Sequence, residues 1–173
     1  MKVSILAFAS PIVAMAIKDR AADVGKLLSP VDKYENGTIA GGIKRPGDDD
    51  IQVICGAPPG SPDNSFPAYD YSYPIGMLLS GGDKRIHVDA GPGKCRQAAC
   101  NDGGGAGVIV CNDGPATDLR AADIGWFAQR VYEKCKTRRD GQDYVEKGQA
   151  FCPDHWNVIL SDVGGQCTAS HLD

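Results

Sequence analysis

A few side chains in this sequence have the chemistry that an acid–base catalyst needs. Histidine and glutamate can give or accept a proton, and arginine can bind a phosphate group. The candidates are His87, His155, Glu133, Glu146 and Arg85. Placed around a phosphodiester, such groups would make a small ribonuclease. His87 and Arg85 are two residues apart, so a regular strand would direct both toward the same face.

The same residues also fit an ordinary protein surface. Histidines on solvent-facing strands usually have no catalytic role, and the sequence contains neither a Gly-x-Ser-x-Gly motif nor an HExxH motif. Trp156 could serve as a sugar-binding platform, but it begins an apolar segment and is expected in the core. We therefore expect a binding protein without enzymatic activity or cofactor, and keep a secreted ribonuclease as the alternative.

The cysteines could bind a metal or form disulfides. Their spacing lacks the paired CxxC of zinc sites, so we expect no metal. Three disulfides would use six of them, and the seventh would stay free or bond to a second chain. We expect a monomer, with a dimer possible through this odd cysteine. The spacing does not select one pairing. The seven candidates are Cys55, Cys95, Cys100, Cys111, Cys135, Cys152 and Cys167.

The N-terminus indicates which of these two roles the cysteines have. Residues 1–16 read MKVSILAFASPIVAMA, with a positive Lys2, an apolar stretch and a small-x-small ending at Ala16. This pattern predicts a signal peptide. The stretch is shorter than the roughly 20 residues that span a bilayer, so we expect no membrane span. A secreted protein folds under oxidising conditions, which favours disulfides.

Residues 17–50 contain no cysteine and few large apolar side chains. This composition predicts a flexible leader or pro-segment. Asn36 begins an Asn-Gly-Thr sequon, so it is a candidate glycosylation site. Lys44 and Arg45 form a candidate dibasic processing site, although Pro46 directly after them disfavours cleavage.

The remaining chain suits one small domain over residues 51–167, followed by a tail at residues 168–173. The sequence holds 22 glycines and 11 prolines, which indicates many turns. Its net charge of −4 comes without any basic run interleaved with aromatics, so no nucleic-acid partner is expected.

Hydrophobic periodicity predicts one long helix over residues 116–136, begun by Thr117 or Asp118 and carrying Cys135 on its apolar face. A disulfide from Cys135 should therefore join the helix to the sheet or to a loop. A short helix is expected at residues 75–79. Residues 56–74 are expected to be a loop, in which Tyr69, Tyr71 and Tyr73 alternate and would share one side of an extended chain. These tyrosines form either a recognition surface or a cover for the core.

Alternating or continuous β-branched residues predict strands at 51–54, 84–89, 107–111, 145–151 and 156–160, the last two forming a hairpin. The tetrapeptide Cys-Asn-Asp-Gly flanks the strand 107–111 on both sides. Asn-Asp-Gly favours tight turns, so the first copy is expected to turn into this strand and the second to turn out of it, and neither is expected to bind phosphate. The predicted fold is an α+β sandwich held by disulfides, with an antiparallel sheet of about four to five strands, one long amphipathic helix and one short helix.

Several segments together resemble a known group of proteins. These are the strand ending in Cys55, the PGKC segment at 92–95, VIVCNDG at 108–114, the helix ending in Cys135, and GQAF at 148–151 with WNVIL at 156–160 before Cys167. The pattern resembles small cysteine-rich proteins secreted by filamentous fungi, including the necrosis-inducing effector domain family. Its order of elements is also similar to that of the virally encoded fungal killer toxins with an α/β-sandwich fold.

The resemblance implies a function by binding. Proteins of these groups provoke or suppress host defence, block a channel or inhibit a host enzyme, and no catalytic residue is implied. We therefore expect a secreted virulence effector or toxin that binds an extracellular host protein or cell-surface target, in the apoplast if the host is a plant. A killer-type antimicrobial toxin is a further alternative.

Overall fold

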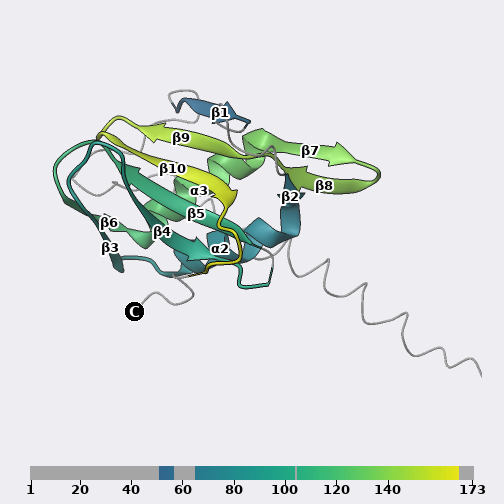
Figure 1. Cartoon of the computed structure of the whole chain (residues 1–173), viewed down its shortest axis with the longest axis horizontal. Helices are drawn as coiled ribbons and strands as arrows, with labels where there is room; N and C mark the ends of the chain where they lie inside the picture. Colours follow the sequence, from purple (N-terminus) through teal and green to yellow (C-terminus); the bar gives the residue numbers. More distant parts are fainter. Residues whose placement is uncertain (1–50, 57–64, 104, 168–173) are drawn as a thin grey trace, which may run out of the picture.

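The computed structural model describes residues 51–56, 65–103 and 105–167 (Figure 1). Within them, the chain forms mainly antiparallel sheets, two helices and three disulfides, which confirms the α+β class at this level. The predicted signal peptide, the leader with Asn36, Lys44 and Arg45, and the tail at 168–173 lie outside the described residues.

The main sheet has five strands in the order β1-β9-β10-β5-β4, each antiparallel to its neighbours. The long central strands β5 and β10 pair over their whole length, from Trp156 opposite Asn112 to Asp162 opposite Ala106. The strands are β1 (Val53–Cys55), β4 (Lys94–Cys100), β5 (Ala106–Asn112), β9 (Gly148–Cys152) and β10 (Trp156–Asp162).

Two smaller sheets extend this body. One has the order β2-β8-β7, and its β7–β8 hairpin projects from the main sheet in Figure 1. The other is the two-stranded pair β3-β6. Their strands are β2 (Phe66–Pro67), β3 (Arg85–Val88), β6 (Thr117–Arg120), β7 (Lys136–Arg139) and β8 (Gln142–Val145). The predicted strand 145–151 begins too early: residues 148–151 belong to β9, whereas Val145 ends the separate strand β8.

Both helices, α2 (Ala68–Ser80) and α3 (Ala121–Cys135), pack on the same face of the main sheet and against each other. The core between the layers is fully buried at Val110, Val158 and Phe127. The helices have 13 and 15 residues, so they are nearly equal in length instead of one long and one short.

The second helix begins later than predicted. Residues Thr117–Arg120 form β6 and pair with β3, so Thr117 and Asp118 belong to a strand and do not cap the helix. Arg120 stands at the N-cap instead, and its guanidinium binds the fully buried Asp123 through two hydrogen bonds of 2.7 and 2.9 Å. The strand pairing overrides the local capping preference of Thr117 and Asp118.

The first helix is where the prediction fails most. The described part of the expected loop 56–74 includes the first half of α2, which continues through Pro74. Proline is disfavoured inside helices because it has no N–H to donate four residues back, here to the carbonyl of Asp70. The side chain of Asn101 donates to that carbonyl at 3.5 Å and to Oδ1 of Asp70 at 3.3 Å. This partner from another part of the chain compensates for the missing helical bond.

Three disulfides join the elements, as predicted, and their pairing is now defined. The bond between Cys55 and Cys135 ties α3 to β1, as expected for the helix cysteine. Cys95 and Cys111 link β4 to β5, and Cys100 is bonded to Cys167 near the C-terminus. The free cysteine is Cys152, which is buried in β9.

The two Cys-Asn-Asp-Gly copies lead into and out of β5, as predicted. The first copy ends β4, a strand that the sequence did not predict, and begins the turn into β5, whereas the second copy ends β5. In each copy the glycine N–H donates to the asparagine Oδ1 two residues earlier, at 3.2 Å for Asn101 and 3.0 Å for Asn112. The repeated sequence thus makes the same local turn twice.

Candidate functional site

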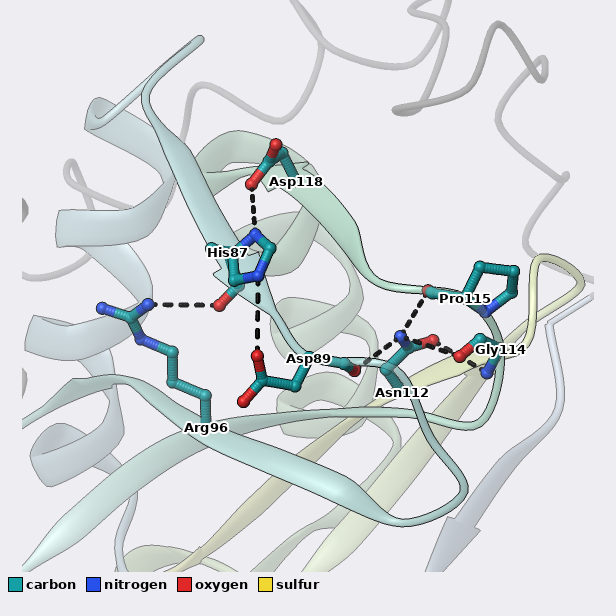
Figure 2. A network of polar contacts seen from close by, with 7 residues as sticks. All are labelled: His87, Asp89, Arg96, Asn112, Gly114, Pro115 and Asp118. Atoms are coloured by element: carbon teal, nitrogen blue, oxygen red, sulfur yellow. Dashed lines mark hydrogen bonds and ion pairs between the residues drawn. The ribbon is translucent and has the colours of Figure 1, made fainter.

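Two regions of the described structure are candidates for function. The first is a polar cluster around His87, on the exposed side of β3 (Figure 2). Its Nδ1 lies 2.8 Å from Oδ1 of Asp118, and its Nε2 lies 3.6 Å from Oδ1 of Asp89. Asp118 faces His87 because the two residues are direct partners in the β3–β6 pair. A carboxylate on Nδ1 orients the ring, which is the arrangement of a general base.

Two arginines border this cluster and are bound to backbone carbonyls. Arg85 donates from Nη1 to the carbonyl of Asp118 at 3.2 Å, and Arg96 donates to the carbonyl of His87 at 3.1 Å. Arg85 and His87 are both exposed and both contact Asp118, so they lie on the same side of β3. The two arginines therefore stabilise the backbone of the β3–β6 pair.

Asn112 fixes the loop that carries Asp89. Its fully buried Nδ2 donates to the carbonyls of Asp89 at 2.9 Å, Pro115 at 2.7 Å and Gly114 at 3.3 Å (Figure 2). The loops meet so closely that a Cβ on Gly91 would overlap the carbonyl of Asn112. The second Cys-Asn-Asp-Gly copy thus supports the His87 cluster.

The other candidate catalytic residues have separate surroundings. His155 lies in the turn between β9 and β10, with a positive φ of 63°, and its carbonyl accepts a hydrogen bond from the N–H of Asp113. Glu133 is bound to Gln129 and Arg130 on α3. Among the described contacts of these groups, none joins either of them to the His87 cluster.

Glu146 is also engaged elsewhere, with Oε1 2.9 Å from Nη2 of Arg139. Of the five candidates, therefore, only Arg85 and His87 share a contact in the described part of the chain. Asp89 and Asp118 were missed, because their proximity to His87 depends on the strand register.

The second candidate region is the outward face of α2, which we call the tyrosine face. Tyr69 and Tyr73 are 59 % and 58 % exposed, and they lie one helical turn apart. Tyr71 points the other way and is fully buried, with its ring at 6.1 Å from that of Phe66 in an edge-on arrangement. The three tyrosines therefore divide between surface and core, since a helix and not an extended strand carries them.

Along α2, the residues next to the exposed tyrosines are small and uncharged. Ser72 and Gly76 adjoin them at helical spacing, and the one acidic residue of the helix, Asp70, is buried. Burial raises the pKa of Asp70 above its ordinary value. The tyrosine face is therefore aromatic and without an exposed charge of the helix's own. A spacing of four between Tyr69 and Tyr73 was the available sequence signal, but the following Pro74 argued against a helix.

Cys152 does not have the properties of a nucleophile. It is 7 % exposed, and burial raises its pKa to about 12. The thiol is thus protonated at neutral pH, whereas nucleophilic cysteines require the thiolate. A disulfide-linked dimer through Cys152 would require β9 to separate from its neighbours, so that the buried thiol becomes accessible.

One group of possible metal ligands occurs in the described part of the chain, comprising Cys100, Asp102 and Cys167. Two of its three members are bonded to each other in a disulfide. Because metal ligation by cysteine requires the thiolate, this group does not offer a metal site.

Within the residues described, neither helix is long and apolar enough to cross a membrane. The chain matches no protein-family profile, and comparisons with curated proteins and with solved structures find no significant match. The two candidate regions therefore have to be judged on their own chemistry.

Proposed function

We propose that this protein is a secreted effector or toxin that binds an extracellular host protein through the tyrosine face. The observation that carries the proposal is the exposure of Tyr69 and Tyr73 on one face of α2, whose other face is buried in the core. A large aromatic side chain held in water by a rigid helix loses little conformational freedom on binding. Tyrosine is accordingly enriched among the residues that dominate binding energy.

The scaffold supports this role. Tyr71, Ile75 and Leu78 of the same helix are fully buried, so the tyrosine face cannot shift without disturbing the core. Three disulfides cross-link the domain, which suits a protein that must remain folded outside the cell. A preorganised surface also binds more tightly, because less order has to be created on association.

The proposal can be tested by infiltrating the purified oxidised protein into plant tissue and scoring cell death and defence responses. We expect the wild type to change these responses, and the Tyr69→Ser/Tyr73→Ser variant to lose roughly tenfold or more in potency, since truncating a tyrosine hot spot typically costs more than about 1 kcal/mol. His87→Ala is the control and should retain activity. Full activity of the double serine variant would contradict the proposed surface, and an inert wild type would contradict the effector role.

A ribonuclease is the second candidate, favoured by the 2.8 Å contact between His87 and Asp118. Incubation with total RNA distinguishes the two functions: a ribonuclease must cleave the RNA, and His87→Ala must abolish cleavage. A killer-type toxin would use the tyrosine face against a different target. Growth inhibition of competing fungi, lost in the double serine variant, would identify that target class.

A further inference from the structure

Two pairs of adjacent basic residues occur in the described part of the chain, Lys84-Arg85 and Arg138-Arg139. Secretory proteases that cleave after paired basic residues would recognise either sequence. The structure gives the two pairs different surroundings. Lys84-Arg85 leads into β3, whereas Arg138-Arg139 ends β7 at the tip of the β7–β8 hairpin.

The bond after Arg85 is held within the fold. The next residue, Ile86, is 6 % exposed and belongs to the core. Arg85 lies in the β3–β6 pair, and its guanidinium donates to the carbonyl of Asp118 at 3.2 Å. The carbonyl of Lys84 accepts a hydrogen bond from the N–H of Ala121 at 2.8 Å. A protease needs several extended residues on both sides of the bond, so it could cut here only after β3 had left the core.

The bond after Arg139 lies at an open tip instead. Residues 138–142 are all exposed, and the hairpin turns at Asp140 and Gly141, which have positive φ angles of 50° and 79°. In Figure 1 this hairpin projects from the body of the molecule. Exposed turn tips open locally at little cost in free energy, and they are preferred sites of proteolytic nicking. Cleavage after Arg139 therefore requires only the end of the hairpin to open.

The strand before this bond is already extended and has an accessible edge. β7 is the last strand in the order β2-β8-β7, so no strand of the described residues pairs with its outer edge. Such an edge can bind to a partner's strand through main-chain hydrogen bonds, which is how serine proteases hold the residues before the cut. Arg139 is bonded to Glu146 at 2.9 Å and to Ser65 at 3.3 Å, but its side chain is 53 % exposed. Exposed ion pairs contribute little, so an acidic protease pocket can replace these partners.

We propose that the peptide bond between Arg139 and Asp140 is a processing site for a serine protease specific for paired basic residues. Water is added across this bond, which leaves a carboxylate on Arg139 and an amino group on Asp140. The proposal rests on the secretory route of the proposed function, because such proteases act in the Golgi. It does not depend on the tyrosine face, which lies on a different element.

The cleaved protein would remain a single molecule. The disulfide between Cys100 and Cys167 joins the chain before the cut to the chain after it, whereas the other two disulfides lie entirely before it. β10 also stays paired with β5 along its whole length, and β9 stays paired with β1. The mature protein is therefore a two-chain molecule whose second chain begins at Asp140 and supplies β8, β9 and β10.

The site can be tested by incubating the purified oxidised protein with a Golgi-type serine protease specific for paired basic residues, beside a reduced and denatured sample. The denatured chain should be cut after both Arg85 and Arg139. In the folded protein the cut after Arg139 should be at least about tenfold faster, because cleavage follows the population of the open form. Mass spectrometry identifies each cut, and the pieces on either side of Arg139 should separate only under reduction. Folded protein that resists this cut, or is cut first after Arg85, would overturn the proposal.

Two variants and two producing strains complete the test. Arg138→Gln/Arg139→Gln should lose the cut, whereas Arg138→Lys keeps a basic pair and should be cut as the wild type is. Both variants change only exposed side chains, so both should fold. A yeast strain with its Golgi dibasic protease should secrete the cut protein, and a strain without the protease should secrete it uncut. Uncut protein from the first strain would overturn the processing alone, whereas protein absent from both media would contradict secretion and with it the proposed function.

Discussion

The tetrapeptide Cys-Asn-Asp-Gly occurs at residues 100–103 and again at 111–114, and the two copies differ in what the asparagine amide binds. Asn101 is half-buried, and its amide donates to Asp70 in α2, the helix that presents the tyrosine face. Asn112 is 1 % exposed, and its amide donates to three backbone carbonyls in the loops beside His87. Each copy therefore supports one of the two candidate functional regions.

The two copies share what their own four residues determine and differ in what the surrounding fold adds. The bond from the glycine N–H to the asparagine side chain is the same in both copies, because it depends only on neighbouring residues. The amide partners differ because the surrounding strands bring different carbonyls within reach. The contribution of the same tetrapeptide to the free energy of unfolding should therefore differ strongly between the two copies.

The largest expected effects come from the disulfides of the two copies. The bond from Cys100 to Cys167 closes a sequence separation of 67 residues, whereas that from Cys111 to Cys95 closes 16. The chain-entropy relation gives a stabilisation of about 4 kcal/mol for the first and about 3 kcal/mol for the second. Denaturant unfolding of the Cys100→Ser/Cys167→Ser and Cys95→Ser/Cys111→Ser proteins should give losses in this order. The reverse order would show that native-state contacts outweigh loop length.

The next effect distinguishes the asparagines themselves. Asn112→Ala should lower the free energy of unfolding by about 2–3 kcal/mol, because it leaves buried carbonyls without their donor. Asn101→Ala should cost about 1 kcal/mol, since its bonds are longer and partly exposed. Chemical denaturation measures both values.

Matched aspartate variants separate the role of the amide donors from that of the side-chain oxygen. Asn112→Asp and Asn101→Asp keep the oxygen that accepts from the glycine N–H but lose the amide donors. Asn112→Asp should therefore remain strongly destabilised, because the loss lies in the donors. Equal losses for the two alanine variants would contradict different roles for the copies.

A smaller effect couples Asn101 to the proline in α2. In a Pro74→Ala background, the N–H of residue 74 can donate to the carbonyl of Asp70, so this helical bond is restored. The cost of Asn101→Ala should then fall by about 0.5 kcal/mol. A double-mutant cycle on unfolding free energies measures this coupling, and a coupling of zero would exclude the compensation that we describe.

The smallest effect is the pH dependence contributed by Asp70. Because burial raises its folded-state pKa, the folded protein binds the proton more tightly than the unfolded chain does. Wild-type stability should therefore fall relative to Asp70→Asn as the pH rises from below 3.8 through the raised pKa. The amide introduced by this substitution would keep an oxygen to accept from Asn101. Unfolding experiments at each pH measure the difference in stability between the wild type and Asp70→Asn. A difference that stays constant over this range would show that folding does not raise the pKa of Asp70.

The sequence was sufficient for those features that depend on local pattern or on the number and placement of the cysteines. The α+β class, three disulfides, the bond from the helix cysteine to the sheet, and both Asn-Asp-Gly turns followed from it. The β9–β10 hairpin was also foreseen. These features need only neighbouring residues or residue types.

Long-range contacts account for what was missed. Pro74 indicated a loop, but packing and the amide of Asn101 keep α2 helical through it. Pairing with β3 converted the expected start of the second helix into β6. Likewise, Asp118 faces His87 only through strand register, and the tyrosine face exists only once α2 is a helix. Neither arrangement can be identified from spacing alone.

The proposed role of the tyrosine face can be tested directly by site-specific photo-cross-linking. A benzophenone side chain would replace Tyr73 in one protein and His87 in another, and each would be illuminated in plant extracellular fluid. We expect a discrete adduct from position 73 that excess wild-type protein competes away, and none from position 87. An adduct from position 87 alone would place the target at the polar cluster and exclude the tyrosine face as the binding surface.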